Sequence, residues 1–215
     1  MAQWPGMARV FTSAKLWIAV LAAVVGVAAG AAMMVLPDII GGGRERLPPT
    51  LTTGTATVGG PFELRTHDGK VVRDKDFRGR VMVVFFGYSR CRQACPAGLQ
   101  ALTEALEELG SQASDIVPIL ITIDPAYDTP ERLAAYVDRY HPRMIGLTGS
   151  EAAIKAVAKA YYAHFRRIDD PTAPGGYTIS HQALFYVIGR DGKYVTHFSF
   201  ATPVAEIVAL LKSAK

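Results

Sequence analysis

Residues 81–99 of this 215-residue chain read VMVVFFGYSRCRQACPAGL and indicate a buried strand that is followed by a helix. Its first seven residues form a continuous apolar block rich in β-branched and aromatic side chains, which is typical of a strand covered on both faces. Pro96 suits the first position of a helix, and leucines at three- and four-residue spacing extend that helix to about Leu109. A buried strand that leads directly into a helix predicts a sheet with helices packed against it.

The rest of the chain alternates between strand and helix patterns. The apolar run 116–123 predicts a second buried strand, and Thr129-Pro130 then signals the start of a helix. Two strands at 183–189 and 194–200 flank a turn and predict a hairpin. The other expected elements are short strands near 62–64 and 71–72, a helix with Ile154, Val157, Ala158 and Tyr161 on its apolar side, and a helix over 204–211, with Tyr161 and Tyr162 both in the core. This order predicts an α/β fold with a central mixed sheet flanked by helices, the central strands being parallel.

The N-terminal part of the chain predicts a membrane anchor. Residues 16–36 contain no charged side chain and, as a helix, would span roughly 30 Å of hydrocarbon. Arg9 and Lys15 precede this run, which places the N-terminus in the cytoplasm and exports the remainder. A cleaved signal peptide is the alternative, but the run is longer than a usual signal core. The expected division is a cytoplasmic tail (1–15), a transmembrane anchor (16–36), a flexible linker rich in Gly, Pro and Thr (37–60) and one folded domain (61–215).

Composition narrows the classes of function. The formal net charge of +4 includes Arg9 and Lys15, so residues 37–215 carry only +2, which is too weak a field to indicate nucleic-acid binding. Two cysteines give neither a disulfide framework nor a four-thiolate zinc site. The placement of these two cysteines therefore carries the functional argument.

Cys91 and Cys95 lie where the buried strand becomes a helix, a position that exposes side chains at the edge of a sheet. With Pro96 as the first helical residue, Cys95 is expected at the N-cap and Cys91 in the preceding loop. The helix dipole and the flanking Arg90 and Arg92 then favour the thiolate form, which binds a soft metal or attacks a disulfide. Two buried, inert structural cysteines are the alternative.

Residues 87–96 resemble the GYxxCxxxCP motif of the Sco/SenC family, membrane-tethered proteins with a thioredoxin fold that are implicated in assembling the dinuclear copper centre of cytochrome c oxidase. Residues 124–130 resemble the family's DPxxDTP segment, and residues 142–149 are similar to its PRFIGLTG segment. Residues 177–192 resemble the segment that carries its histidine ligand. Together these segments cover most of residues 61–213 in the same order, so the resemblance implies a thioredoxin-like fold.

The resemblance also implies a copper site formed by Cys91, Cys95 and His181. Two thiolates and one imidazole suit Cu(I) by softness, and Cu(II) can occupy such a site if further ligands join. The implied function is that of a copper metallochaperone that supports assembly of the dinuclear centre. Its partners would be a copper donor protein and the copper-receiving subunit of a haem-copper oxidase.

The alternative function is that of an enzyme, a thiol-disulfide oxidoreductase with Cys91 and Cys95 as its redox pair. Such an enzyme would reduce the cysteines of the oxidase subunit before metal insertion. Three residues separate the two thiols, whereas dedicated oxidoreductases typically use Cys-x-x-Cys, so the carrier is favoured.

The N-terminal residues also indicate in which membrane and compartment the protein lies. An Ala-rich anchor after a short, Arg-poor N-terminus favours a bacterial inner membrane with the C-terminal domain in the periplasm. The mitochondrial inner membrane, with the domain facing the intermembrane space, is the alternative.

Two positions depart from the family pattern. The family commonly has Pro after the first cysteine and Asp before the histidine, where this chain has Arg92 and Ser180. Ser180 lacks the charge that could hold an imidazole tautomer, so metal affinity and redox tuning are expected to differ.

Several other polar residues have structural interpretations. Asp128 precedes a helix that begins with Pro130, so helix capping explains it. The sequence does not decide whether Asp124 and Tyr88 support the site or have a purely structural role. The histidines expected to be ordinary structural or surface residues are His67, His141, His164 and His197.

Overall fold

The structure of the protein is a computed structural model, and it describes residues 57–214. The predicted tail, the membrane anchor and most of the linker lie outside the described residues. Between residues 57 and 214, no helix combines the length and the apolar character needed to cross a membrane. The anchor over residues 16–36 therefore stays a prediction.

A seven-stranded mixed sheet lies at the centre, in the strand order β2-β1-β5-β4-β3-β8-β9. Its strands are β1 (Glu63–Thr66), β2 (Val71–Arg73), β3 (Val81–Gly87), β4 (Ile116–Thr122), β5 (Ile145–Thr148), β8 (Leu184–Ile188) and β9 (Tyr194–Ser199). The central strands β3, β4 and β5 are parallel. β1 and β8 pair with them antiparallel, and β9 forms a hairpin with β8. The predicted mixed sheet, with a parallel centre and a hairpin at one side, is confirmed.

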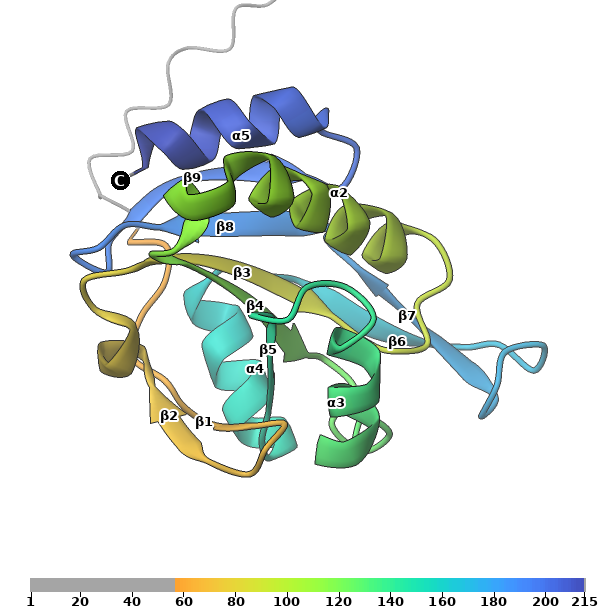
Figure 1. Cartoon of the computed structure of the whole chain (residues 1–215). Coiled ribbons are helices and arrows are strands. Elements are labelled where there is room, and N and C mark those ends of the chain that lie inside the picture. Colours follow the sequence, from red (N-terminus) through yellow and green to blue (C-terminus); the bar gives the residue numbers. More distant parts are fainter. Residues whose placement is uncertain (1–56, 215) are drawn as a thin grey trace, which may run out of the picture. The chain divides into compact units, whose positions relative to one another are not determined.

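Helices cover both faces of this sheet, as Figure 1 shows. α2 (Ala94–Leu109) and α5 (Val204–Ser213) pack together on one face, and α3 (Pro130–Val137) and α4 (Glu151–Ala160) lie on the other. Two short 3-10 helices, Asp74–Phe77 and Gly110–Ala113, follow β2 and α2. Because helices lie on both sides, every residue of β3 and β4 is buried. This explains why both strands are nearly unbroken apolar runs and do not alternate.

Two further strands, β6 (Phe165–Asp169) and β7 (Tyr177–His181), form a separate antiparallel ribbon that projects beside the main sheet (Figure 1). The sequence pattern does not indicate this ribbon, because β6 reads FRRID and four of its five residues are exposed. The chain reverses between the strands near Gly175 and Gly176, whose φ angles are 86° and 78°. The ribbon places His181 at the end of its second strand.

The end of α4 corrects one expectation about the core. Tyr161 is 1% exposed and its ring contacts the rings of Phe86 and Tyr186, as expected. Tyr162 is 51% exposed, so its expected place in the core was wrong. The helix ends at Ala160, and Tyr162 adopts a left-handed backbone conformation with φ 54°. The helical period therefore stops before it reaches Tyr162.

Asp128 has a different role from the expected helix cap. Thr129 is the N-cap residue of α3, and its side chain accepts a hydrogen bond from the backbone N–H of Arg132. The Asp128 carboxylate is fully buried and accepts from the Ser89 N–H at 3.1 Å, from the Thr122 hydroxyl at 2.6 Å and from the Ser89 hydroxyl. Burial raises the pKa of this carboxyl, against the effect of these donors. Asp128 thus joins the loop after β3 to the end of β4.

Replacement of Asp128 should therefore destabilise the protein more than loss of the actual cap. We expect Asp128→Ala to lower the free energy of unfolding by about 3 kcal/mol or more, because it leaves buried donors on Ser89 and Thr122 unpaired. Thr129→Ala, the matched control, should cost about 1 kcal/mol. Urea unfolding of both variants measures the two losses in free energy of unfolding. Equal losses would contradict the buried role of Asp128 and favour helix capping.

Candidate metal centre

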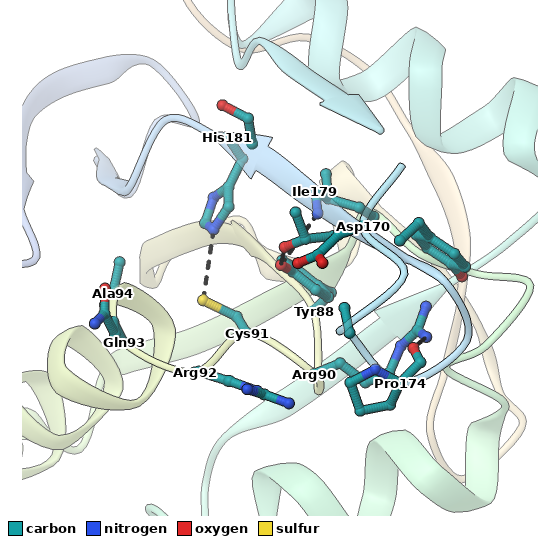
Figure 2. Close-up of a pocket in the computed structure, with 14 residues that line it drawn as sticks. Tyr88, Arg90, Cys91, Arg92, Gln93, Ala94, Asp170, Pro174, Ile179 and His181 are labelled. Carbon is teal, nitrogen blue, oxygen red and sulfur yellow. Dashed lines mark hydrogen bonds between the residues drawn. The ribbon is translucent and has the colours of Figure 1, made fainter. Parts of the chain in front are cut away.

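Three side chains from distant parts of the chain meet at one end of the central sheet. Cys91 lies in the loop after β3, Cys95 in the first turn of α2, and His181 at the end of β7. The His181 Nε2 atom lies 3.8 Å from the Cys91 sulfur and 3.5 Å from the Cys95 sulfur. Figure 2 shows the His181 ring directed at Cys91. The structure therefore brings all three predicted site residues together.

Helix α2 begins two residues earlier than expected. It starts at Ala94, so Cys95 is a helical residue of the first turn and not the N-cap. The Gln93 side chain at the N-cap makes no capping hydrogen bond. The Cys91 sulfur accepts a hydrogen bond from the Cys95 N–H at 3.3 Å and so satisfies a first-turn amide. Pro96 fits the same turn because its position needs no donor.

The two sulfur atoms differ in exposure and in protonation. Cys91 is half-buried, whereas Cys95 is 0% exposed. Hydrogen bonds from the Cys95 thiol, from His181 and from the Cys95 N–H lower the pKa of Cys91 to about 4, although partial burial opposes this. Burial raises the pKa of Cys95, and so does the neighbouring Cys91 sulfur. Without a metal, the pair is therefore one thiolate and one thiol at neutral pH.

The two arginines beside the cysteines do not act as expected. The Arg90 guanidinium forms an ion pair with Asp124 at 2.6 Å, and its side chain is only 10% exposed. Arg92 is exposed and lines a cavity of about 420 Å³ together with Cys91 and His181. Figure 2 shows Arg90 beside Pro174. Hydrogen bonds at the sulfur atoms, and not these arginines, are the main cause of the thiolate at Cys91.

His181 is oriented by its surroundings. Its Nδ1 atom lies 3.2 Å from the Gln182 carbonyl oxygen, and a carbonyl can only accept a hydrogen bond. Nδ1 therefore carries a proton, and Nε2 is the ring nitrogen that faces the two sulfur atoms. The rings of Phe85 and Tyr88 contact the imidazole edge-on at 6.0 and 5.8 Å. Ser180 is exposed, and the backbone carbonyl provides the Nδ1 partner that a carboxylate would otherwise supply.

Two residues left open by the sequence hold the ribbon beside the cysteine loop. The Tyr88 hydroxyl lies 3.0 Å from the Thr178 hydroxyl and accepts from the Ile179 N–H at 3.2 Å. Asp124 accepts a hydrogen bond from the Tyr177 hydroxyl at 2.8 Å. Tyr177 is a residue that sequence reasoning missed, because its partner is 53 positions away and no local pattern predicts the pair.

The remaining histidines of the described chain lie outside this group. His67 Nδ1 accepts from the Gly146 N–H, and His141 Nδ1 accepts from the Arg143 N–H. His197 contacts the hydroxyl of Tyr194, and His164 is exposed. All four have the structural or surface positions expected of them.

The donor set of the site suits a soft metal ion. Among residues 57–214, Cys91, Cys95 and His181 are the one group of three or more His, Cys, Asp or Glu residues that could hold a metal, with ligand atoms within 4.8 Å of one another. Two sulfur donors and one imidazole nitrogen favour Cu(I), or Zn²⁺ with a fourth ligand.

Comparisons with known proteins point to one family. A sequence model described as SCO1/SenC matches residues 50–215. The SCO2-like protein RP587 of Rickettsia prowazekii is 35% identical over 156 residues, which cover 73% of this chain and 76% of that protein. Bradyrhizobium japonicum ScoI, solved with copper bound, is 36% identical with a TM-score of 0.68, over 74% of this chain and 99% of that one. Yeast Sco1, also solved with copper bound, is 32% identical with a TM-score of 0.63, over 73% and 90%.

The difference between the two sulfur atoms predicts unequal reactivity. We expect iodoacetamide to modify Cys91 before Cys95 in the reduced, metal-free protein, because Cys91 is accessible and ionised. Since the pKa of Cys91 is about 4, its modification should persist as the pH falls from about 8 to about 5. An ordinary thiol, with a pKa of about 8.5, loses about tenfold in rate per pH unit over that range.

Mass spectrometry of the two cysteine peptides measures this order. Protein unfolded in urea is the control, in which both cysteines should react at similar rates. Two results would contradict the assigned protonation. One is modification of Cys95 before Cys91, and the other is a steep fall in the rate of Cys91 modification as the pH is lowered from about 8 to about 6.

Proposed function

The chain belongs to the SCO1/SenC family, and on that premise we propose that it is a copper carrier that supports assembly of cytochrome c oxidase. Its α/β fold is the thioredoxin-like fold of that family. The observation that carries the proposal is the convergence of Cys91, Cys95 and His181, whose ligand atoms lie within 4.8 Å of one another. The copper-bound relative from Bradyrhizobium japonicum, 36% identical, supports the choice of metal.

The residues present fit copper as the cargo. Two thiolates and a neutral imidazole are the donors that Cu(I) prefers, and the orientation of His181 already presents Nε2 to the sulfur atoms. Binding requires the Cys95 thiol to lose its proton, so loading at neutral pH releases about one proton per ion. Cu(II) is a second possible cargo if a further ligand joins.

The site also has the features that transfer requires. Cys91 and His181 are half-buried and line a cavity of about 420 Å³, so ligands of a second protein can approach from solvent. Three ligands leave copper open to an incoming thiolate or imidazole, and exchange then proceeds one ligand at a time. The proposed partners are a copper donor protein and the copper-receiving subunit of a haem-copper oxidase.

Substitutions at the three ligands test the proposal. We expect the reduced protein to bind about one copper ion per chain, and Cys91→Ala or Cys95→Ala to remove most of the affinity because each deletes an anionic soft ligand. His181→Ala should weaken binding, because it removes the imidazole ligand, and should leave the fold intact. Competition with a Cu(I) chelator measures the affinities, and circular dichroism monitors the fold.

His197→Ala is the matched control, because this histidine lies on β9 and contacts Tyr194 and not the cysteines. It should bind copper like the unmodified protein. Equal copper retention by all ligand variants would place the site elsewhere. A reduced protein that binds no copper but rapidly reduces a disulfide in an oxidase subunit would favour the oxidoreductase alternative.

The location that fits this role is the periplasmic side of a bacterial inner membrane, with residues 16–36 as a single-pass anchor. Support comes from the sequence, since Arg9 and Lys15 precede the apolar run. We expect a periplasm-active reporter fused after Lys215 to be active and a cytoplasm-active reporter at the same place to be silent. The opposite result would reverse the topology and remove the delivery role.

A further inference from the structure

The side chain of Arg90 joins the cysteine loop to two other segments. Its guanidinium lies between the rings of Tyr127 and Tyr177, with 4.1 and 4.2 Å from the central carbon to the ring centres. One terminal nitrogen forms the 2.6 Å ion pair with Asp124, and the other donates to the Pro174 carbonyl. Its Nε atom is buried without a hydrogen-bond partner, so the rings and the two terminal nitrogens set the position of the group.

These partners belong to segments with different roles. Asp124 and Tyr127 follow β4 at the end of the central sheet, whereas Pro174 and Tyr177 belong to the turn and second strand of the ribbon. Tyr177 also donates its hydroxyl proton to Asp124 at 2.8 Å. Arg90, the residue next to Cys91, therefore connects the cysteine loop to the end of the main sheet and to the ribbon in one partly buried cluster.

The ribbon depends on such side-chain contacts for its position. β6 and β7 pair only with each other, so no backbone ladder holds them to the main sheet. An isolated two-stranded ribbon is marginally stable in water. Besides the Arg90 cluster, Tyr88 holds the ribbon through its bonds to Thr178 and Ile179, and Ile179 also packs into the hydrophobic core. The position of His181, the last residue of β7, therefore depends in part on the Arg90 cluster.

We propose that Arg90 is a positioning residue of the metal centre, which sets the place of His181 relative to the thiolates by fastening the ribbon to the cysteine loop. The inference rests on the proposed copper binding and identifies what governs the third ligand. A buried ion pair adds little to stability because desolvation offsets the attraction, so a purely stabilising role explains this cluster poorly. The planar guanidinium can stack on two rings and form two hydrogen bonds in different directions at the same time, which a lysine cannot do.

Substitution of Arg90, compared with an exposed arginine far from the cysteine loop, tests the inference. Arg90→Gln should weaken copper binding about tenfold or more and change the electron paramagnetic resonance spectrum of bound Cu(II), because His181 is no longer held in place. Arg90→Lys, which keeps the charge opposite Asp124, should have an intermediate effect. Arg73→Gln on the edge strand β2, which breaks an exposed ion pair with Glu63, should match the unmodified protein.

Hydrogen exchange of the metal-free protein gives a readout that copper affinity does not influence. In Arg90→Gln, the amide of Ile179 in β7 should exchange about tenfold faster, while the amides of β3 keep their rates. Faster exchange throughout β3 as well would mark general destabilisation and overturn the positioning role. The Arg90→Lys variant keeps the test decisive if the glutamine variant fails to fold.

Different experimental results would refute this inference and the proposed function. This inference alone is overturned if Arg90→Gln and Arg90→Lys bind copper as tightly as the unmodified protein and the Cu(II) spectrum is unchanged. An unmodified protein that binds no copper overturns the proposed function, and the inference about the ligand falls with it.

Discussion

Complete burial of β3 and β4 governs where the helices and the cysteine loop of this protein lie. Two neighbouring parallel strands without an exposed residue require helices on both faces, so the chain leaves both strands through turns at the same edge of the sheet. The polar groups of these turns then meet, and Asp128 joins Ser89 to Thr122 there. The cysteine loop is thereby attached to the end of the core. This arrangement exposes one reactive sulfur while its neighbouring backbone stays hydrogen-bonded.

The parts of the site that depend on local sequence could be predicted. Unbroken apolar runs indicate β3 and β4, and a cysteine pair between a buried strand and a helix indicates a loop of paired sulfur atoms. His181 required the family resemblance, because a histidine 86 residues from Cys95 gives no local signal. The start of α2 was missed because the residues that usually cap helices carry oxygen side chains, whereas here the Cys91 sulfur accepts the amide of Cys95.

The parts that depend on tertiary placement could not be predicted. β6 carries charged residues on a largely exposed strand, so it lacks the apolar alternation by which strands are recognised. Arg90 was expected to stabilise a thiolate, and instead it pairs with groups 34 and 84 residues away. A charged residue in a loop has several partners within reach, and only the packed structure decides among them. Tyr177 could not be identified from the sequence for the same reason, because its contacts form only in the packed structure.

The span between the ligands has a consequence for the lifetime of the protein. Cys95 and His181 are 86 residues apart, so a metal ion held between them closes a long loop that the unfolded chain leaves open. For a covalent link of this span, the lost chain entropy corresponds to about 4 to 5 kcal/mol. A bound ion acts in the same direction, because the three ligands meet only in the folded chain, which therefore binds the ion more tightly than the unfolded chain does. The carrier would then be most resistant to proteolysis while it holds its cargo, and delivery would leave behind the more easily degraded form.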